Sequence, residues 1–190
     1  MTQKSEAKKQ YILETARKVF ADKGYKDVTM KDIVEACDIS RGGLYLYFGS
    51  TEEIFLEILK EDTEGSDSAF EEAIRGKTSA EEILQLFLEE QKKELLAEDD
   101  TLSVATYEYG FLKKDESFLR AKFNEATRVI EYLIRLGCHQ KKFHCRNAHK
   151  MAVNVMFLIE GLKISARTIR VTGEEVDDEI AFILEELRGS

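Results

Sequence analysis

The chain has 190 residues, 43% of them hydrophobic and 34% charged, which suits one compact protein of one or two domains. Its 37 acidic and 28 basic residues give a net charge of −9, so the chain as a whole is no obvious binder of nucleic acid. No apolar run reaches the roughly 18 residues of a membrane span. The first ten residues lack the apolar stretch of a secretion signal, and three cysteines form no disulfide pattern, so we expect a cytoplasmic protein without a membrane partner.

The absence of proline favours long helices joined by short connections, and we expect an all-α fold of about nine helices. Ser5 is expected to cap the first helix, Gly24 to end it, and Tyr25 to fold back on its last turn. A second, short helix is expected to start at Thr29, which can form a capping box with Asp32.

A tight break follows, where Asp38 tolerates a left-handed backbone and Ser40 can cap a third short helix. Ser50 and Glu53 fit a capping box that opens a fourth helix. Gly137 is expected to end a later helix. Helical periodicity predicts helices over about residues 40–46, 51–75, 79–97, 101–111, 115–136, 145–170 and 173–188, with 145–170 mostly buried because it is apolar around much of its circumference.

The glycine-rich stretch DISRGGLYLYFGSTEE, residues 38–53, has two possible interpretations. A nucleotide-binding loop needs a lysine followed by Ser or Thr after its last glycine, whereas Gly49 is followed by two hydroxyls and two carboxylates. The spacing instead predicts a helix–turn–helix, with the second helix ending near Ala36 and the third beginning at Ser40.

In a helix–turn–helix the second helix of the pair enters the major groove of DNA. Gly42 and Gly43 would leave its backbone free to approach the DNA closely, and Arg41 is suited to the edge of a guanine.

Four apolar or aromatic side chains accompany these glycines. Leu44 and Phe48 lie four residues apart, so we expect both to pack inward. Tyr45 and Tyr47 are expected to offer their hydroxyls to phosphate oxygens, the alternative being that both tyrosines belong to the core.

The segment from Ile12 to Phe55 resembles the N-terminal DNA-binding domain of the TetR family of bacterial transcriptional repressors. The matching pieces are "A…VF…KGY", "VTMKDIVEACDIS" and "SRGGLYLYF", and "FLIEGLKISAR" resembles the family's penultimate helix, which pairs subunits. The resemblance implies a helix–turn–helix domain over residues 1–50 and an effector-binding and dimerisation domain over 51–190. It also implies a ligand-responsive repressor that binds a pseudo-palindromic operator in double-stranded DNA as a homodimer and is released by a small-molecule effector.

The resemblance also assigns the residues that contact DNA. Thr29 and Lys31 would meet the backbone, Arg41 and Gly43 would read bases, and the tyrosines would contact phosphates. The family usually has lysine where Thr51 stands, which weakens one phosphate contact, and glycine where Asp38 stands. The full expected set is Thr29, Lys31, Ser40, Arg41, Gly42, Gly43, Tyr45, Tyr47, Ser50 and Thr51.

The rest of the chain is acidic, since residues 1–50 carry nine basic and seven acidic side chains and the remainder carries 19 basic and 30 acidic ones. Its last two helices are expected to form the dimer interface through Val155, Leu158, Ile159, Gly161, Leu162, Ile169, Ile180, Ile183 and Leu184. Rings and isolated polar groups on apolar helices suit an effector pocket, and the expected residues are Tyr107, Phe111, Phe118, Arg128, Tyr132, Asn154 and Phe157.

Other functions are less well supported by the sequence. The segment GCHQKKFHCRNAHK holds Cys138, His139, His144, Cys145 and His149, which are potential zinc ligands, but it has no CxxC, and we favour a solvated basic loop with no metal or cofactor. No catalytic motif is present, so we expect no enzyme. A protein-binding regulator without DNA contact is the alternative suggested by the acidic body and by Thr51.

Overall fold

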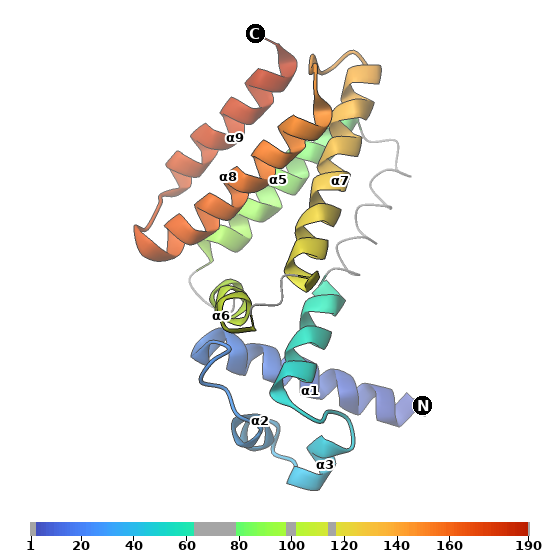
Figure 1. Ribbon diagram of the computed structural model, residues 1–190, viewed down its shortest axis with the longest axis vertical. Helices are drawn as coiled ribbons and strands as arrows, with labels where there is room; N and C mark the ends of the chain where they lie inside the picture. Colours follow the sequence, from blue (N-terminus) through green and yellow to red (C-terminus); the bar gives the residue numbers. More distant parts are fainter. Residues whose placement is uncertain (1–2, 63–78, 98–101, 114–116, 190) are drawn as a thin grey trace. The chain divides into compact units, whose positions relative to one another are not determined.

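The computed structural model describes residues 3–62, 79–97, 102–113 and 117–189 (Figure 1). Within these ranges the regular structure is entirely helical, which confirms the all-α fold. The helices are α1 (Gln3–Lys23), α2 (Met30–Cys37), α3 (Arg41–Tyr45), a helix over residues 51–62, α5 (Ala80–Leu96), α6 (Ser103–Lys113), α7 (Ser117–His139), α8 (Ala148–Thr168) and α9 (Gly173–Arg188). None of the described helices is long and apolar enough to cross a membrane.

The helices form two compact units. The head unit contains α1, α2, α3, the helix over residues 51–62, and α6, whereas the body unit contains α5, α7, α8 and α9. An aromatic cluster explains why α6 belongs to the head: the Phe55 ring centroid lies 4.9 Å from that of Phe20, 4.9 Å from that of Tyr25 and 5.6 Å from that of Tyr109 in α6. The expected boundary at residue 50 is a functional one, between the segment that binds DNA and the segment that binds effector and partner, and it stays a prediction.

Local signals placed most helix ends correctly, and Ser5 is an exception. Gly24 ends α1 with φ of +77°, and the Tyr25 ring stacks on Phe20 as expected. Ser5, however, lies inside α1 rather than at its N-cap, and its hydroxyl lies 3.4 Å from that of Tyr47. The expected end of the fourth helix near Arg75 falls outside the described residues.

Gly137 does not end its helix, contrary to the sequence-based expectation. It lies within α7, which continues to His139, and the chain then folds back so that the Phe143 ring covers this glycine. A Cβ on Gly137 would lie 2.1 Å from Phe143 Cδ2. The glycine therefore makes room for a buried ring.

The body unit is built on one apolar core shared by its four helices. Its centre includes Leu84, Leu133 and Ile134, none of which is exposed. The prediction that residues 145–170 are mostly buried is wrong within a single chain, because α8 buries one side and leaves Phe157 and Ile164 exposed on another.

Candidate nucleic-acid interface

The helix–turn–helix geometry rests on three local devices. Thr29 Oγ1 accepts a hydrogen bond from Asp32 N at 3.3 Å, and Asp32 Oδ2 accepts one from Thr29 N at 2.8 Å, so the expected capping box is confirmed. Asp38 ends α2 with φ 50° and ψ 47°, as its left-handed tolerance predicted. Ser40 Oγ then accepts a hydrogen bond from Gly43 N at 3.1 Å and caps α3.

The capping box is reinforced by charge. Hydrogen bonds from Lys23 and then from Thr29 hold the pKa of the Asp32 carboxyl well below its usual range. The carboxylate stays ionised at neutral pH and favours the positive N-terminal end of α2.

The glycines of α3 leave part of its surface bare. A Cβ built on Gly42 would have no atom within 4 Å, so this position faces open space. Leu44 beside it is fully buried and Phe48 nearly so, which confirms that these two side chains pack inward. The helix is thus held by one apolar face and presents backbone on the other.

The two tyrosines lie at the surface rather than in the core. Tyr45 is 49% exposed, and Tyr47 is half-buried with its hydroxyl beside that of Ser5. The core interpretation is therefore wrong for Tyr45. A groove of about 400 Å³ adjoins Tyr47 and is lined by Ser5, Lys9, Leu46, Tyr47, Phe48, Glu53 and Glu57.

Cations of the head unit fall into two groups. Five are paired with carboxylates of the same unit: Lys9 with Glu57, Arg17 with Asp62, Lys23 with Asp32, Lys31 with Glu35, and Lys113 with Glu52. A second group, Lys4, Lys8, Lys18, Lys26 and Arg41, has no carboxylate partner within the described part of the chain. Arg41, which is predicted to read a base, therefore forms no ion pair with a described carboxylate.

Lys8 was not singled out in the sequence, because nothing there shows which residue of α3 it faces. Its Nζ lies 3.8 Å from the place that a Cβ on Gly43 would occupy. An ammonium from α1 thus lies where α3 has no side chain of its own. Leu46 was also not singled out, although it is 83% exposed directly after α3.

The start of the helix over residues 51–62 differs slightly from the expected capping box. Ser50 Oγ accepts from Glu53 N at 3.1 Å, but the Glu53 carboxylate accepts from Gly49 N at 2.6 Å instead of from Ser50 N. The hydroxyls of Ser50 and Thr51 lie at this helix N-terminus, next to a carboxylate that disfavours a close phosphate.

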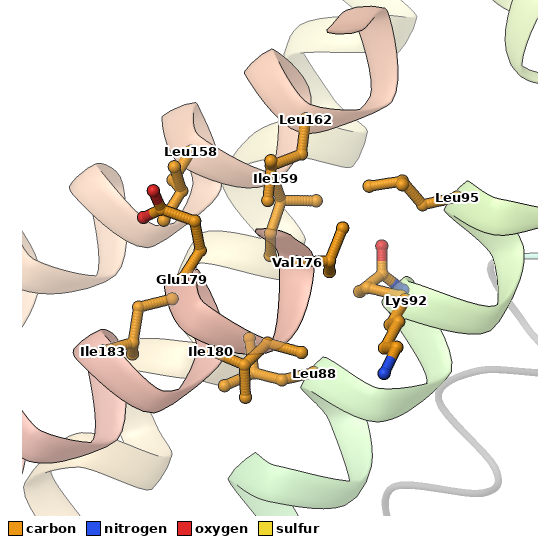
Figure 2. Close-up of a pocket in the computed structure, with 11 residues that line it drawn as sticks. Leu88, Lys92, Leu95, Leu158, Ile159, Leu162, Val176, Glu179, Ile180 and Ile183 are labelled. Atoms are coloured by element: carbon orange, nitrogen blue, oxygen red, sulfur yellow. The ribbon is translucent and has the colours of Figure 1, made fainter. Parts of the chain in front are cut away.

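The residues expected at the effector pocket are divided between the two units, since Tyr107 and Phe111 belong to α6 and the other five to α7 and α8. Phe111 is 80% exposed, and Arg128 and Asn154 are exposed as well. None of the seven lines the apolar cavity of the body unit shown in Figure 2.

That cavity lies between α5, α8 and α9 and measures about 20 Å³, room for about one water molecule. Side chains from the three helices point toward one another across it. Among them are Leu88 and Leu95 of α5, Leu158 and Leu162 of α8, and Ile180 of α9.

Several residues expected at the dimer interface are already covered by their own chain. Each is at most 8% exposed, which leaves a partner little to bury, and they are Val155, Ile159, Ile180, Ile183 and Leu184. Leu158 and Leu162 are partly buried, and Gly161 and Ile169 are exposed.

The three histidines of the cysteine- and histidine-rich segment are exposed and its two cysteines partly buried, which agrees with the expected solvated loop. His144 N donates to Leu187 O at 2.6 Å, and the His149 ring lies 2.8 Å from Glu131 Oε2. Hydrogen bonds from His149 and then from Arg135 lower the pKa of Glu131. Within the described residues no three such side chains gather as metal ligands.

Two family models match the chain. "Bacterial regulatory proteins, tetR family" matches residues 12–58, and "Tetracyclin repressor-like, C-terminal domain" matches residues 83–177. The HTH-type transcriptional regulator YfiR of Bacillus subtilis is 36% identical over 142 residues, which cover 70% of this chain and 66% of that protein. The HTH-type transcriptional repressor AcnR of Corynebacterium efficiens is 29% identical over 161 residues, which cover 85% of this chain and 77% of AcnR.

Solved structures share the fold at low identity. A cysteine mutant of the TetR family regulator CifR, complexed with a 26-bp operator DNA, has a TM-score of 0.73 at 23% identity and covers 94% of this chain and 95% of its own. A regulator from Saccharomonospora viridis in complex with choline has a TM-score of 0.81 at 23% identity. The match covers 95% of this chain and 96% of that regulator.

Proposed function

The chain belongs to the TetR family of bacterial regulatory proteins, which are DNA-binding regulators of transcription, and we propose that it is a repressor that binds a pseudo-palindromic operator as a homodimer and leaves it when a small-molecule effector binds. The observation that carries this proposal is the head unit's helix–turn–helix. Its α3 is held by buried Leu44 and presents bare backbone at Gly42 beside the exposed, unpaired Arg41.

Base reading is assigned to Arg41. Its guanidinium can donate two hydrogen bonds to O6 and N7 of a guanine in the major groove. Gly42 and Gly43 let the helix come close enough for that contact, since neither carries a side chain that would hold the backbone away.

Phosphate contacts are assigned to groups that surround α3. They are the hydroxyls of Tyr45 and Tyr47, and Thr29 and Lys31 at the start of α2. Lys8 adds an ammonium next to Gly43, which offsets the missing lysine at position 51. The remaining contacts are Ser40, Ser50 and Thr51, whose hydroxyls lie at helix N-termini, where backbone N–H groups favour anions, although the Glu53 carboxylate weakens the last two.

A homodimer follows from how an operator is read, because two recognition helices must lie about 34 Å apart to reach two half-sites one helical turn apart. The interface is assigned to the apolar residues that one chain leaves uncovered. On α8 these are Gly161 and Ile164, three residues apart and therefore on one side of the helix, and on α9 the exposed ring is Phe182. Leu158, Leu162 and Ile169 complete the set.

Effector binding is assigned to the rings and polar groups already named in α6, α7 and α8. Contacts within the head unit support a route from effector to DNA, because polar contacts join α6 to the helix over residues 51–62 and to the turn before α2. Lys113 Nζ lies 2.7 Å from Glu52 Oε2, the Tyr109 hydroxyl donates to Glu52 at 3.4 Å, and Lys26 N donates to Glu108 at 3.1 Å. An effector that displaces α6 would therefore displace the helix–turn–helix, and the coupling would be reciprocal.

The experiment that tests the proposal is footprinting of DNA upstream of the protein's own gene, followed by fluorescence anisotropy on the protected duplex. We expect affinity to fall steeply as salt rises, because neutralised phosphates release counterions. Choline and a long-chain fatty acid are the first effector probes, since one structural neighbour was solved with choline and a Bacillus subtilis relative, 32% identical over 117 residues, is named a fatty acid metabolism regulator. Failure to bind any upstream fragment at low salt would contradict the proposal and favour the protein-binding alternative.

A further inference from the structure

Leu46 has the most exposed large hydrophobic side chain in the described part of the chain, at 83%. A single exposed leucine is ordinary on a protein surface. This leucine, however, directly follows α3 and lies between Tyr45 and Tyr47, in the segment assigned to DNA. If this segment contacts DNA, the Leu46 side chain must contact some group of the DNA.

The backbone shows which way Leu46 faces. Leu46 has helical angles, φ −70° and ψ −22°, and its N–H donates to Gly42 O at 3.2 Å, so it continues the turn of α3. Residues four apart lie on one face of a helix, and a helical side chain leans toward the preceding turn. Leu46 therefore lies one turn from Gly42, where a Cβ would meet no atom within 4 Å, and it also borders the groove beside Tyr47.

The surface formed by Gly42 and Leu46 is uncovered, and we name it the Gly42–Leu46 step. One end is bare backbone and the other is an isobutyl group. In the major groove, thymine is the base that offers an apolar group, its C5-methyl, while the other edges offer hydrogen-bond donors and acceptors. A phosphate would gain nothing from a leucine, because its oxygens would lose water without a hydrogen bond in return.

We propose that Leu46 is a specificity-determining residue that reads thymine: the C5-methyl of one thymine in each half-site packs on the Gly42–Leu46 step, beside the base read by Arg41. This inference rests on the DNA-binding function proposed above. It adds a base contact that the sequence did not assign and that needs no hydrogen bond.

The test uses operator duplexes in which each thymine is replaced in turn by deoxyuridine, which removes only the methyl group. For the wild-type protein we expect one thymine per half-site at which the replacement weakens binding about fourfold, the effect of one buried methyl, and about fifteenfold when both half-sites are changed. Leu46→Ala should bind the thymine operator more weakly and no longer distinguish thymine from deoxyuridine at that position.

Leu86→Ala is the matched control, because Leu86 is 62% exposed but lies on α5 in the body unit. It should keep the wild-type response to every deoxyuridine, and thermal melts should show that both variants are folded. If Leu46→Ala kept the wild-type response at every position, or if the wild type responded at none, the inference would be overturned while the DNA-binding function stood. If the wild type bound no duplex, the function itself would be overturned, and the inference with it.

Discussion

The head unit and the body unit are both built from α-helices, yet the sequence predicts the details of the head much better than those of the body. In the head, Thr29, Asp38 and Ser40 each act on the backbone within about three residues, and the structure shows each of them in its expected role. In the body, helices were found at nearly the expected positions, but the faces assigned to a partner subunit were often those that pack inside one chain. Local hydrogen bonds can be recognised in a sequence, whereas the neighbour of an apolar face cannot.

The largest expected effect is a loss of stability in the body unit, from substitutions that do not touch the helix–turn–helix of the head unit. Phe143→Ala removes a fully packed ring and should lower the free energy of unfolding by about 3–5 kcal/mol. Gly137→Ala should cost about 1–3 kcal/mol, because its Cβ would overlap that ring. Urea denaturation followed by circular dichroism measures both.

The pair also provides its own check, because residues in direct contact should not behave additively. The double variant should lose less than the sum of the two single losses, since the alanine at 137 would occupy space vacated by Phe143. Phe111→Ala, at an exposed ring, should change stability by less than about 0.5 kcal/mol. Strictly additive losses at 137 and 143 would contradict this account of the glycine.

The second prediction sharpens the assignment of inner and outer faces on α8 and α9. Ile164→Asp combined with Phe182→Asp should convert the dimer to monomer, because each substitution puts a charge into an apolar interface and costs about 2 kcal/mol or more of association. Light scattering after gel filtration measures the mass. Leu86→Asp, on α5, should remain dimeric, and a double variant that also stayed dimeric would place the interface elsewhere.

The third prediction concerns base reading by the head. Arg41→Ala should remove about 1–3 kcal/mol of discrimination at one base pair in each half-site and leave the preference at other positions unchanged. Anisotropy against operators carrying each single base change measures this pattern. Tyr47→Phe should instead weaken all sequences alike, and an Arg41→Ala protein with wild-type preference would disprove the arginine's role.

The fourth prediction tests whether Lys8 contacts a phosphate. In Lys8→Ala the slope of log affinity against log salt should become shallower by about 1.8 for a dimer, which is about 0.9 for each lost contact. Lys18→Ala is the comparison, because it removes an equally unpaired cation about 15 Å further along α1. Equal slopes for both variants and the wild type would remove Lys8 from the interface.

The smallest expected effect is the pH dependence of the α2 capping box. The pKa of Asp32 is lowered in the folded head, so its contribution to stability is present above the unfolded-state pKa of about 3.9 and is lost as pH falls through the lower folded-state value. Wild-type melting temperature should therefore fall more steeply below pH 4 than that of Asp32→Asn. Parallel curves between pH 7 and pH 2.5 would show that the carboxylate adds nothing, and the difference is expected to be small because solvent still reaches the carboxylate.

The sequence by itself determined the all-α fold, most helix ends and the residues of the helix–turn–helix. Caps, a left-handed Asp38 and inward Leu44 all act over one or two turns, so their spacing is enough to place them. The same spacing could not show that Ser5 meets Tyr47, because 42 residues separate them.

Only the tertiary structure decided which apolar surfaces remain uncovered. Gly137 resembled a helix end until Phe143 was seen to lie against it, and Val155 resembled an interface residue until the body core was seen to bury it. Leu46 is the reverse case, since a leucine between two tyrosines resembles core and is almost fully exposed. Hydrophobic periodicity fixes which residues share a helix face, but burial depends on what packs against that face, and the chain's three-dimensional course alone supplies the partner.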